Sequence, residues 1–287
     1  MNKFFTLFSF FIQLSLSGCV TVPDYTSPEH YDLNNPQKSF FPESLNEVSG
    51  ISFYNLQADT IYAIQDELGR LFQLPTGSKE NQHYTFGKTG DYEDLSIAGE
   101  TVYVLKSNGH IYQFPFHQKN NLDIDAVLIH KHLVAKGEYE SMFADATNKQ
   151  MIIVAKKPKD DDREATIKAF RINMHQNDSL SLDEPFFIDV REILKDETYS
   201  KTKEKKIRPS AVSQNPVTGE WYMLASINKL LIIFDNEWKV KSWYHLSPKL
   251  FKQPEGLCFD RQGNMYISNE GNDMNAPTLL KFQYVSK

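Results

Sequence analysis

The chain has 287 residues, of which 40% are apolar, 13% aromatic and 24% charged, with a formal net charge of −6 at pH 7. This is an ordinary globular composition, long enough to bury a sizeable core and rich in the aromatic residues that favour β structure. The mildly acidic balance, with no long basic tract apart from residues 201–208, argues against nucleic acid as a partner.

Residues 1–18 predict a lipoprotein signal peptide. Lys3 precedes an apolar stretch at 4–17, which is shorter than the about 20 residues that a membrane-spanning helix needs. The stretch ends in Leu-Ser-Gly-Cys, which resembles the bacterial lipobox, so Cys19 is the predicted site of lipidation. An ordinary signal peptide with an incidental cysteine is the alternative. We expect a protein anchored by lipid in the bacterial cell envelope, at the periplasmic or outer-membrane face, with the membrane as its partner.

Five repeated units follow, each opening with an acidic or polar phrase ahead of a short apolar strand. Glu47 and Glu93 are 46 residues apart, Glu93 and Glu140 are 47 apart, and Ser210 and Glu255 are 45 apart. A period in the forties with strand-like content is typical of propeller blades. The gap of 70 residues between Glu140 and Ser210 implies an insertion in the third unit.

Each of the first four units resolves into four strand-like runs, which is the size of one blade. The fifth unit ends after three runs, and this would leave an unpaired edge in the ring. We expect residues 30–41 to supply the missing outer strand. A six-bladed ring, the alternative, would need about forty further residues. The prediction is therefore an all-β, five-bladed β-propeller over residues 30–287, closed by an N-terminal strand and preceded by a tether at 19–29. Cys258, in an apolar run, is expected to be a buried, inert thiol.

The acidic phrases are expected to meet at one end of the central channel, because the innermost strand of every blade starts at the same face. Like charges brought this close need protons or a cation between them. Oxygen ligands suit a hard cation, Ca²⁺ tolerates irregular coordination, and the scattered histidines make no zinc pattern. The predicted cofactor is therefore Ca²⁺, with these metal ligands: Glu47, Glu93, Glu140 and Glu255.

Two other roles remain open for these acids. A carboxylate at the head of each blade can accept hydrogen bonds from the neighbouring backbone and lock blade to blade. Arg208, ahead of Pro209 and Ser210 in the fourth unit, can neutralise the ring as an ion-pair partner. Asp91 and Asp94, the other acids of the second phrase, are interpreted as local hydrogen-bonding or solvated residues.

Polar side chains also end the second strand of every unit, and they make a second candidate set. Their variety (acid, hydroxyl, amine, amide) is more typical of a ligand surface than of a repeated brace, although hairpin ends are polar in general. This set consists of Asp66, Ser107, Lys156, Ser226, Asn269 and Glu270. The predicted ligand-binding residues are Asp66, Lys156, Arg208, Ser210 and Glu270.

Several phrases resemble the SdiA-regulated (YjiK-like) family of bacterial envelope β-propellers. Asn-Glu-Val-Ser-Gly-Ile at 46–51, Gly-Asp-Tyr-Glu-Asp at 90–94, Ile-Arg-Pro-Ser at 207–210 and Gln-Pro-Glu-Gly at 253–256 occur in order at blade spacing. The resemblance covers roughly residues 43–284. It implies a secreted or lipid-anchored propeller, often linked to calcium, and a more distant similarity to phytase-like and lactonase-type propellers, where central acids hold Ca²⁺ and activate water. The family's acidic places fall on Glu47, Glu93, Glu140 and Glu255, while the fourth unit departs with Arg208-Pro209-Ser210.

The predicted function is a non-catalytic binding or scaffold role, with a divalent cation or a small ligand at the channel mouth. The alternative is a calcium-dependent hydrolase of a phosphoester or lactone, in which metal-bound water attacks and one Glu takes its proton. Lys156 and Arg208 would then bind phosphate. A third hypothesis makes the insertion at 157–206 a docking arm for an envelope protein, against the simpler interpretation of a solvated loop. The protein is expected to be a monomer.

Overall fold

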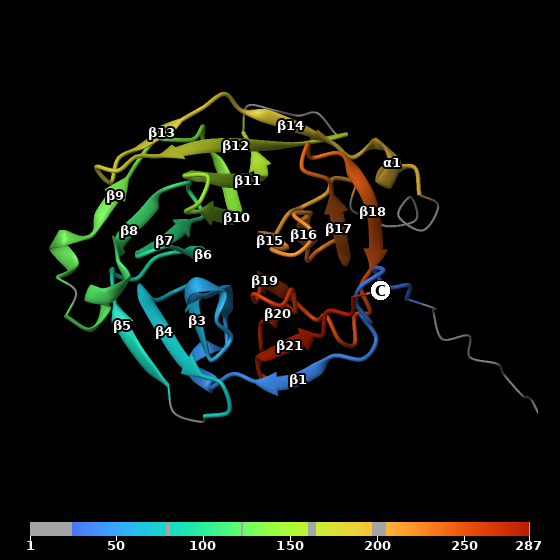
Figure 1. Ribbon diagram of the computed structural model, residues 1–287, viewed down its shortest axis with the longest axis horizontal. Coiled ribbons are helices and arrows are strands. Elements are labelled where there is room, and N and C mark those ends of the chain that lie inside the picture. Colours follow the sequence, from blue (N-terminus) through green and yellow to red (C-terminus); the bar gives the residue numbers. More distant parts are fainter. Residues whose placement is uncertain (1–24, 79–80, 122, 160–164, 197–204, 287) are drawn as a thin grey trace, which may run out of the picture.

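The computed structural model describes residues 25–78, 81–121, 123–159, 165–196 and 205–286. Cys19 and the predicted signal peptide lie outside the described residues, as do parts of the predicted insertion. Five small antiparallel sheets stand around a central axis as the blades of a propeller, which confirms the predicted fold (Figure 1).

Three blades are plain four-stranded sheets. The first contains β2 (Val48–Phe53), β3 (Thr60–Gln65), β4 (Arg70–Pro75) and β5 (Gln82–Thr85). The second contains β6 (Tyr92–Ala98), β7 (Thr101–Lys106), β8 (Ile111–Pro115) and β9 (Leu128–His130). The fourth contains β15 (Ala211–Gln214), β16 (Trp221–Ala225), β17 (Leu230–Phe234) and β18 (Val240–His245).

The third blade carries additional structure between Glu140 and Ser210, where the repeat spacing implied an insertion. Its strands are β10 (Gly137–Asp145), β11 (Gln150–Pro158), β12 (Thr166–Met174), β13 (Leu180–Leu182) and β14 (Phe186–Asp189), and the last two both pair with β12. The short helix α1 (Arg191–Leu194) follows, and 3-10 turns occupy Glu43–Leu45, Tyr54–Leu56, Phe116–Asn121 and Ile124–Ala126. Within the described ranges, no helix has the length and apolar character needed to cross a membrane.

The fifth blade closes the ring with an N-terminal strand, as predicted. Its three C-terminal strands are β19 (Pro254–Phe259), β20 (Met265–Asn269) and β21 (Thr278–Phe282). The outer strand is β1 (Gln37–Phe40), which pairs antiparallel with β21 (Figure 1). The phenolic oxygen of Tyr31 donates to the carbonyl of Gly263 at 2.6 Å and accepts from Asn215 Nδ2 at 2.7 Å. The segment before β1 is therefore also part of the folded domain.

The core consists of five hydrophobic clusters, one between each pair of neighbouring blades. Successive side chains of a strand point to opposite faces of its sheet, so one strand serves two clusters. In β16, Trp221, Met223 and Ala225 pack toward the third blade, while Tyr222 and Leu224 pack toward the fifth. This explains why β16 is a continuous apolar run. Cys258 is a buried free thiol between the fifth and first blades.

Hydrogen bonds also join the inner strands of neighbouring blades. Ser52 Oγ in the first blade accepts from the backbone N–H of Ile97 in the second at 3.1 Å. Asp94 accepts from the backbone N–H of Leu95 at 2.8 Å and from that of Met142, in the third blade, at 2.7 Å. The bond from Leu95 is a local hydrogen bond, as expected for Asp94, but the residue is 4% exposed and not solvated, and it also bonds across a blade boundary.

Candidate functional site: the acidic channel mouth

The five inner strands β2, β6, β10, β15 and β19 contact one another around the axis. We call the end at which they begin the channel mouth. Close to that end, the strand pairing shifts register at Glu93 in β6, at Glu140 in β10 and at Glu255 in β19. Such a β-bulge leaves one residue outside the pairing and re-aims its side chain. Three of the four predicted acids therefore share one structural place in three blades.

In the first blade this place belongs to Ser49 and not to Glu47. The register of β2 shifts between Val48 and Ile51, which puts Ser49 where Glu93 stands in β6. The sequence alignment of the repeats paired Glu47 with Glu93 because both are acidic. The strand register shows that the counterpart of Glu93 lies two residues after Glu47, at Ser49.

The structural counterparts of Glu47 are Asp91 in the second blade and Gln253 in the fifth. The backbone N–H of Asp66 donates to the carbonyl of Glu47 at 3.2 Å, and the same bond recurs from Ser107 to Asp91 at 3.0 Å. In the fifth blade Glu270 donates to Gln253 at 3.0 Å. Asp91 is thus a member of a repeated set, which its sequence interpretation as a local residue had missed.

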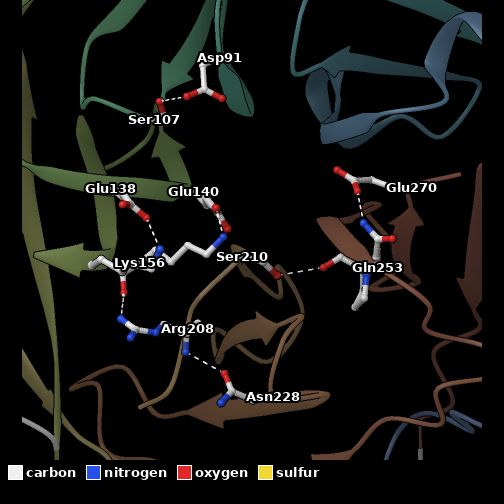
Figure 2. Close-up of polar contacts among 12 residues, drawn as sticks. Asp91, Ser107, Glu138, Glu140, Lys156, Arg208, Ser210, Asn228, Gln253 and Glu270 are labelled. Carbon is white, nitrogen blue, oxygen red and sulfur yellow. Dashed lines mark hydrogen bonds and ion pairs between the residues drawn. The ribbon is translucent and has the colours of Figure 1, made fainter. Parts of the chain in front are cut away.

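These bonds also place the second candidate set beside the first. Asp66, Ser107 and Glu270 follow the strands that pair with the inner strands, so their side chains start next to the bulge residues. Ser107 Oγ donates to the Asp91 carboxylate, and Gln253 Nε2 donates to the Glu270 carboxylate (Figure 2). Sequence reasoning did not single out Gln253, although it directly precedes the Pro-Glu-Gly phrase.

Lys156 belongs to the same set and is the cation that meets the repeated acids. Its ammonium forms an ion pair with the Glu140 carboxylate (Figure 2), and the two side chains are 18% and 14% exposed. Arg208 Nη1 donates to the backbone carbonyl of Lys156 at 3.2 Å and ties the fourth blade to the third beside the mouth.

Ser210, the fourth-blade residue of the bulge set, is a brace between blades. It is 2% exposed, and its Oγ donates to the carbonyl of Pro254 at 2.9 Å. Ser226 directly follows β16 and is 5% exposed, and it lowers the pKa of Glu255 against the larger effect of burial. Asn269 is buried and donates through Nδ2 to Leu250 and Thr278 at 3.2 Å each. Ser210 and Asn269 are therefore engaged in structural hydrogen bonds within the fold.

Burial and mutual repulsion hold protons on two of the bulge acids, Glu93 and Glu255. Burial, followed by the charge of Glu140, raises the pKa of Glu93 to about 9. Burial, followed by the charges of Glu140 and Glu270, raises the pKa of Glu255 to about 8. Burial also raises the pKa of Glu140, although Lys156 opposes it. The shifts of Glu93 and Glu255 both contain the charge of Glu140, an acid from another blade, so ring closure brings these carboxyl groups within electrostatic reach.

The acids of the first blade join the same group. Burial, followed by the charges of Asp66 and Glu47, raises the pKa of Glu270 to about 7. Burial, followed by the charge of Glu47, raises the pKa of Asp66 to about 6. Asp66 Oδ1 and Glu140 Oε2 are buried and have no hydrogen-bond partner among the described residues. Neither oxygen receives a hydrogen bond that would offset the loss of its contacts with water on burial.

The donor set has the chemistry that Ca²⁺ prefers, but it is not a formed cage. In the described part of the chain, no three His, Cys, Asp or Glu side chains are grouped closely enough to hold a metal ion. Glu140 is paired with Lys156 instead. A cation at the mouth would have to draw the carboxylates of Glu93, Glu140 and Glu255 together.

Comparison with known proteins agrees with the fold. A family model described as SdiA-regulated matches residues 27–274. A search of curated proteins gives no match. Among solved structures, a glutaminyl cyclase from Myxococcus xanthus is similar at 11% identity, with a TM-score of 0.53, over 88% of this chain and 98% of that one. A luciferin-regenerating enzyme is similar at 7% identity, with a TM-score of 0.52, over 87% and 95%. At such identities the similarity is one of fold alone.

Proposed function

The chain belongs to the SdiA-regulated family, and from this premise we propose that it is a non-catalytic binding protein whose channel mouth takes a cation or a small cationic ligand. The observation that carries the proposal is the cluster of carboxyl groups with pKa values of about 7 to 9, Glu270, Glu255 and Glu93. Burial disfavours the charged form of these groups and neighbouring acids repel it, so they retain protons near neutral pH. A bound cation would supply compensating positive charge.

Ca²⁺ is the first cation to test, since it accepts six to eight oxygen ligands in irregular geometry. The bulge residues Glu93, Glu140 and Glu255 would hold it. Asp66 Oδ1 and Glu140 Oε2, the buried oxygens without hydrogen-bond partners, support this choice.

The test is calorimetric titration of the purified protein with CaCl₂ at pH 7.5, repeated in two buffers of different ionisation enthalpy. Because Glu93 and Glu255 hold protons at this pH, binding of Ca²⁺ is expected to release about one proton or more into the buffer. Mg²⁺, which demands stricter geometry, is expected to bind more weakly. Absence of both binding heat and proton release with Ca²⁺ would refute the cation site.

A calcium-dependent hydrolase is the second candidate, and one observation favours it. Carboxyl groups with pKa values of about 7 to 9 can transfer protons at neutral pH. The two cations that would bind phosphate are engaged, however: Lys156 contacts Glu140, and Arg208 contacts the backbone of Lys156. Binding is therefore the better supported function. Calcium-dependent release of phosphate from a phosphomonoester, abolished by Glu93→Gln, would reverse this preference.

We also propose that the protein acts in the bacterial cell envelope, held to the membrane through a lipid on Cys19. The support is the apolar stretch at 4–17 followed by Leu-Ser-Gly-Cys.

A further inference from the structure

Lys156 is the one cationic member of the set of residues beside the bulge acids. Where the third blade has Lys156, the other blades have acids or serines, Asp66, Ser107, Ser226 and Glu270. Its side chain extends from β11 toward the inner strand of its own blade, and the ammonium meets the Glu140 carboxylate there (Figure 2).

The charge of Lys156 acts on more than one carboxyl group. Burial lowers the pKa of Lys156, but the charges of Glu140, Glu255 and Glu93 raise it by a larger amount. The pKa therefore lies above the usual value for lysine, and the ammonium is charged at neutral pH. In return Lys156 lowers the pKa of Glu93, Glu140, Glu255 and Glu270 against the larger effect of burial. A single ammonium thus serves acids from the second, third and fifth blades.

The neighbouring residue shows that this placement is specific. Lys157 pairs with Glu138 at 2.6 Å, but the two side chains are 47% and 49% exposed. Exposed pairs of this kind contribute little. Lys157 has the same chemistry one residue away but is more exposed, and its effect on the pKa of Glu140 is smaller than that of Lys156, so it is a matched control for Lys156.

We propose that Lys156 is a built-in counter-cation that occupies the cation position of the channel mouth, so that an external cation binds only by displacing its ammonium from Glu140. The second oxygen of the carboxylate that Lys156 contacts, Glu140 Oε2, is buried and still lacks a hydrogen-bond donor, so one ammonium does not satisfy this carboxylate. The flexible four-carbon stem of a lysine allows the head group to leave. This inference rests on the proposed function and adds the residue that controls access.

The first experiment compares Ca²⁺ binding by the wild type, Lys156→Met and Lys157→Met in calorimetry. Methionine keeps the apolar stem and removes the charge. Removal of a positive charge next to a divalent cation is expected to tighten binding by about tenfold or more, while Lys157→Met, which removes a more exposed charge, is expected to tighten it much less. Binding by Lys156→Met that is equal to or weaker than that of the wild type overturns the inference.

A second variant keeps the inference testable if Lys156→Met folds poorly. Lys156→Ala leaves a gap the length of an alkylammonium ion, so propylammonium chloride is expected to raise its melting temperature more than that of the wild type. Sodium chloride at equal concentration controls for ionic strength, and Lys157→Ala controls for the surface. Equal responses of Lys156→Ala and Lys157→Ala to propylammonium also overturn the inference.

The outcomes separate the two proposals. If the wild type binds no Ca²⁺ but Lys156→Met does, the proposed function fails and the role of Lys156 stands. If the wild type binds Ca²⁺ and Lys156→Met binds no tighter, the function stands and the role of Lys156 fails.

Discussion

The carboxylate of Asp94, in the inner strand of the second blade, accepts a hydrogen bond of 2.7 Å from the backbone N–H of Met142, in the inner strand of the third. Its second acceptor contact, with the N–H of Leu95, measures 2.8 Å. Complete burial raises the pKa of Asp94 well above the usual range, against the effect of these two donors. The blade-locking role considered for the repeated glutamates is thus performed by Asp94.

Replacement of Asp94 by Ala is expected to lower the free energy of unfolding by about 2–3 kcal/mol, because it leaves two buried backbone donors without an acceptor. Urea unfolding measures the change. Asp91→Ala is the control, since Asp91 is exposed, and it is expected to cost less than about 1 kcal/mol. Equal losses in the two variants would show that the bond across the blades is not important.

Removal of residues up to Phe41 is expected to open the ring. It deletes β1, exposes the edge of β21 and removes Tyr31 and Leu33 from the core between the fourth and fifth blades. An exposed edge strand promotes association between chains. We expect a lower melting temperature and higher-order species in size-exclusion chromatography. A truncation that begins at Tyr25 should behave like the full domain, and similar behaviour of both truncations would argue against closure by β1.

Without a bound cation, the free energy of unfolding is expected to fall as the pH rises from 6 to 8. Glu93 titrates near 4.5 when unfolded and at about 9 when folded, and Glu255 at about 8 when folded. Between these values the folded state holds protons that the unfolded state has released, so the stabilisation is present at low pH and lost as pH rises through the folded pKa. Each of the two groups contributes about 1.4 kcal/mol per pH unit, so the slope is on the order of 2 to 3 kcal/mol per pH unit.

Urea midpoints measured in the presence of EDTA give this slope. Glu93→Gln cannot ionise at this position and is expected to reduce the slope, whereas Glu138→Gln, at an exposed pair, should change it much less. A stability that does not depend on pH over this range would contradict the raised pKa values.

Replacement of Cys19 by Ala is expected to release the protein from the membrane fraction, because the lipid would have no thiol to attach to. Fractionation of cells, with detection of the protein in membrane and soluble fractions, measures the shift. Metabolic labelling with a radioactive fatty acid should mark the wild type and not the variant. A wild type that is found in the soluble fraction without label would refute the anchor.

The fold could be predicted because several features of the sequence indicate it independently. Spacings of 45 to 47 residues recur along the chain, and the missing strand of the fifth unit left one edge for residues 30–41 to cover. The bulge register was not predictable in the first blade, because Glu47 and Ser49 are two residues apart and a strand alternates with a period of two. Only the pairing of β2 with β3 shows that Ser49 is the counterpart of Glu93.

The electrostatics of the mouth were predictable only in outline. The repeated acids implied repulsion, and the chain order indicated which residues ring closure would bring together. It could not show that the Lys156 side chain turns back onto Glu140, or that Asp94 turns away from Glu93 into the core. The spacing of residues in the sequence indicates on which strand a residue lies. The direction of its side chain depends on the β-bulges and on the packing between blades.

The most direct test of the cation site is the melting temperature of the purified protein with CaCl₂ and with EDTA. At a Ca²⁺ concentration of about 100 times the dissociation constant, binding adds about 2.7 kcal/mol to the stability, which amounts to several degrees. The Glu93→Gln, Glu140→Gln double variant is expected to lose this shift, while Glu138→Gln keeps it. A wild type that melts at the same temperature in Ca²⁺ and in EDTA, or a double variant that keeps the full shift, would contradict a cation site at the channel mouth.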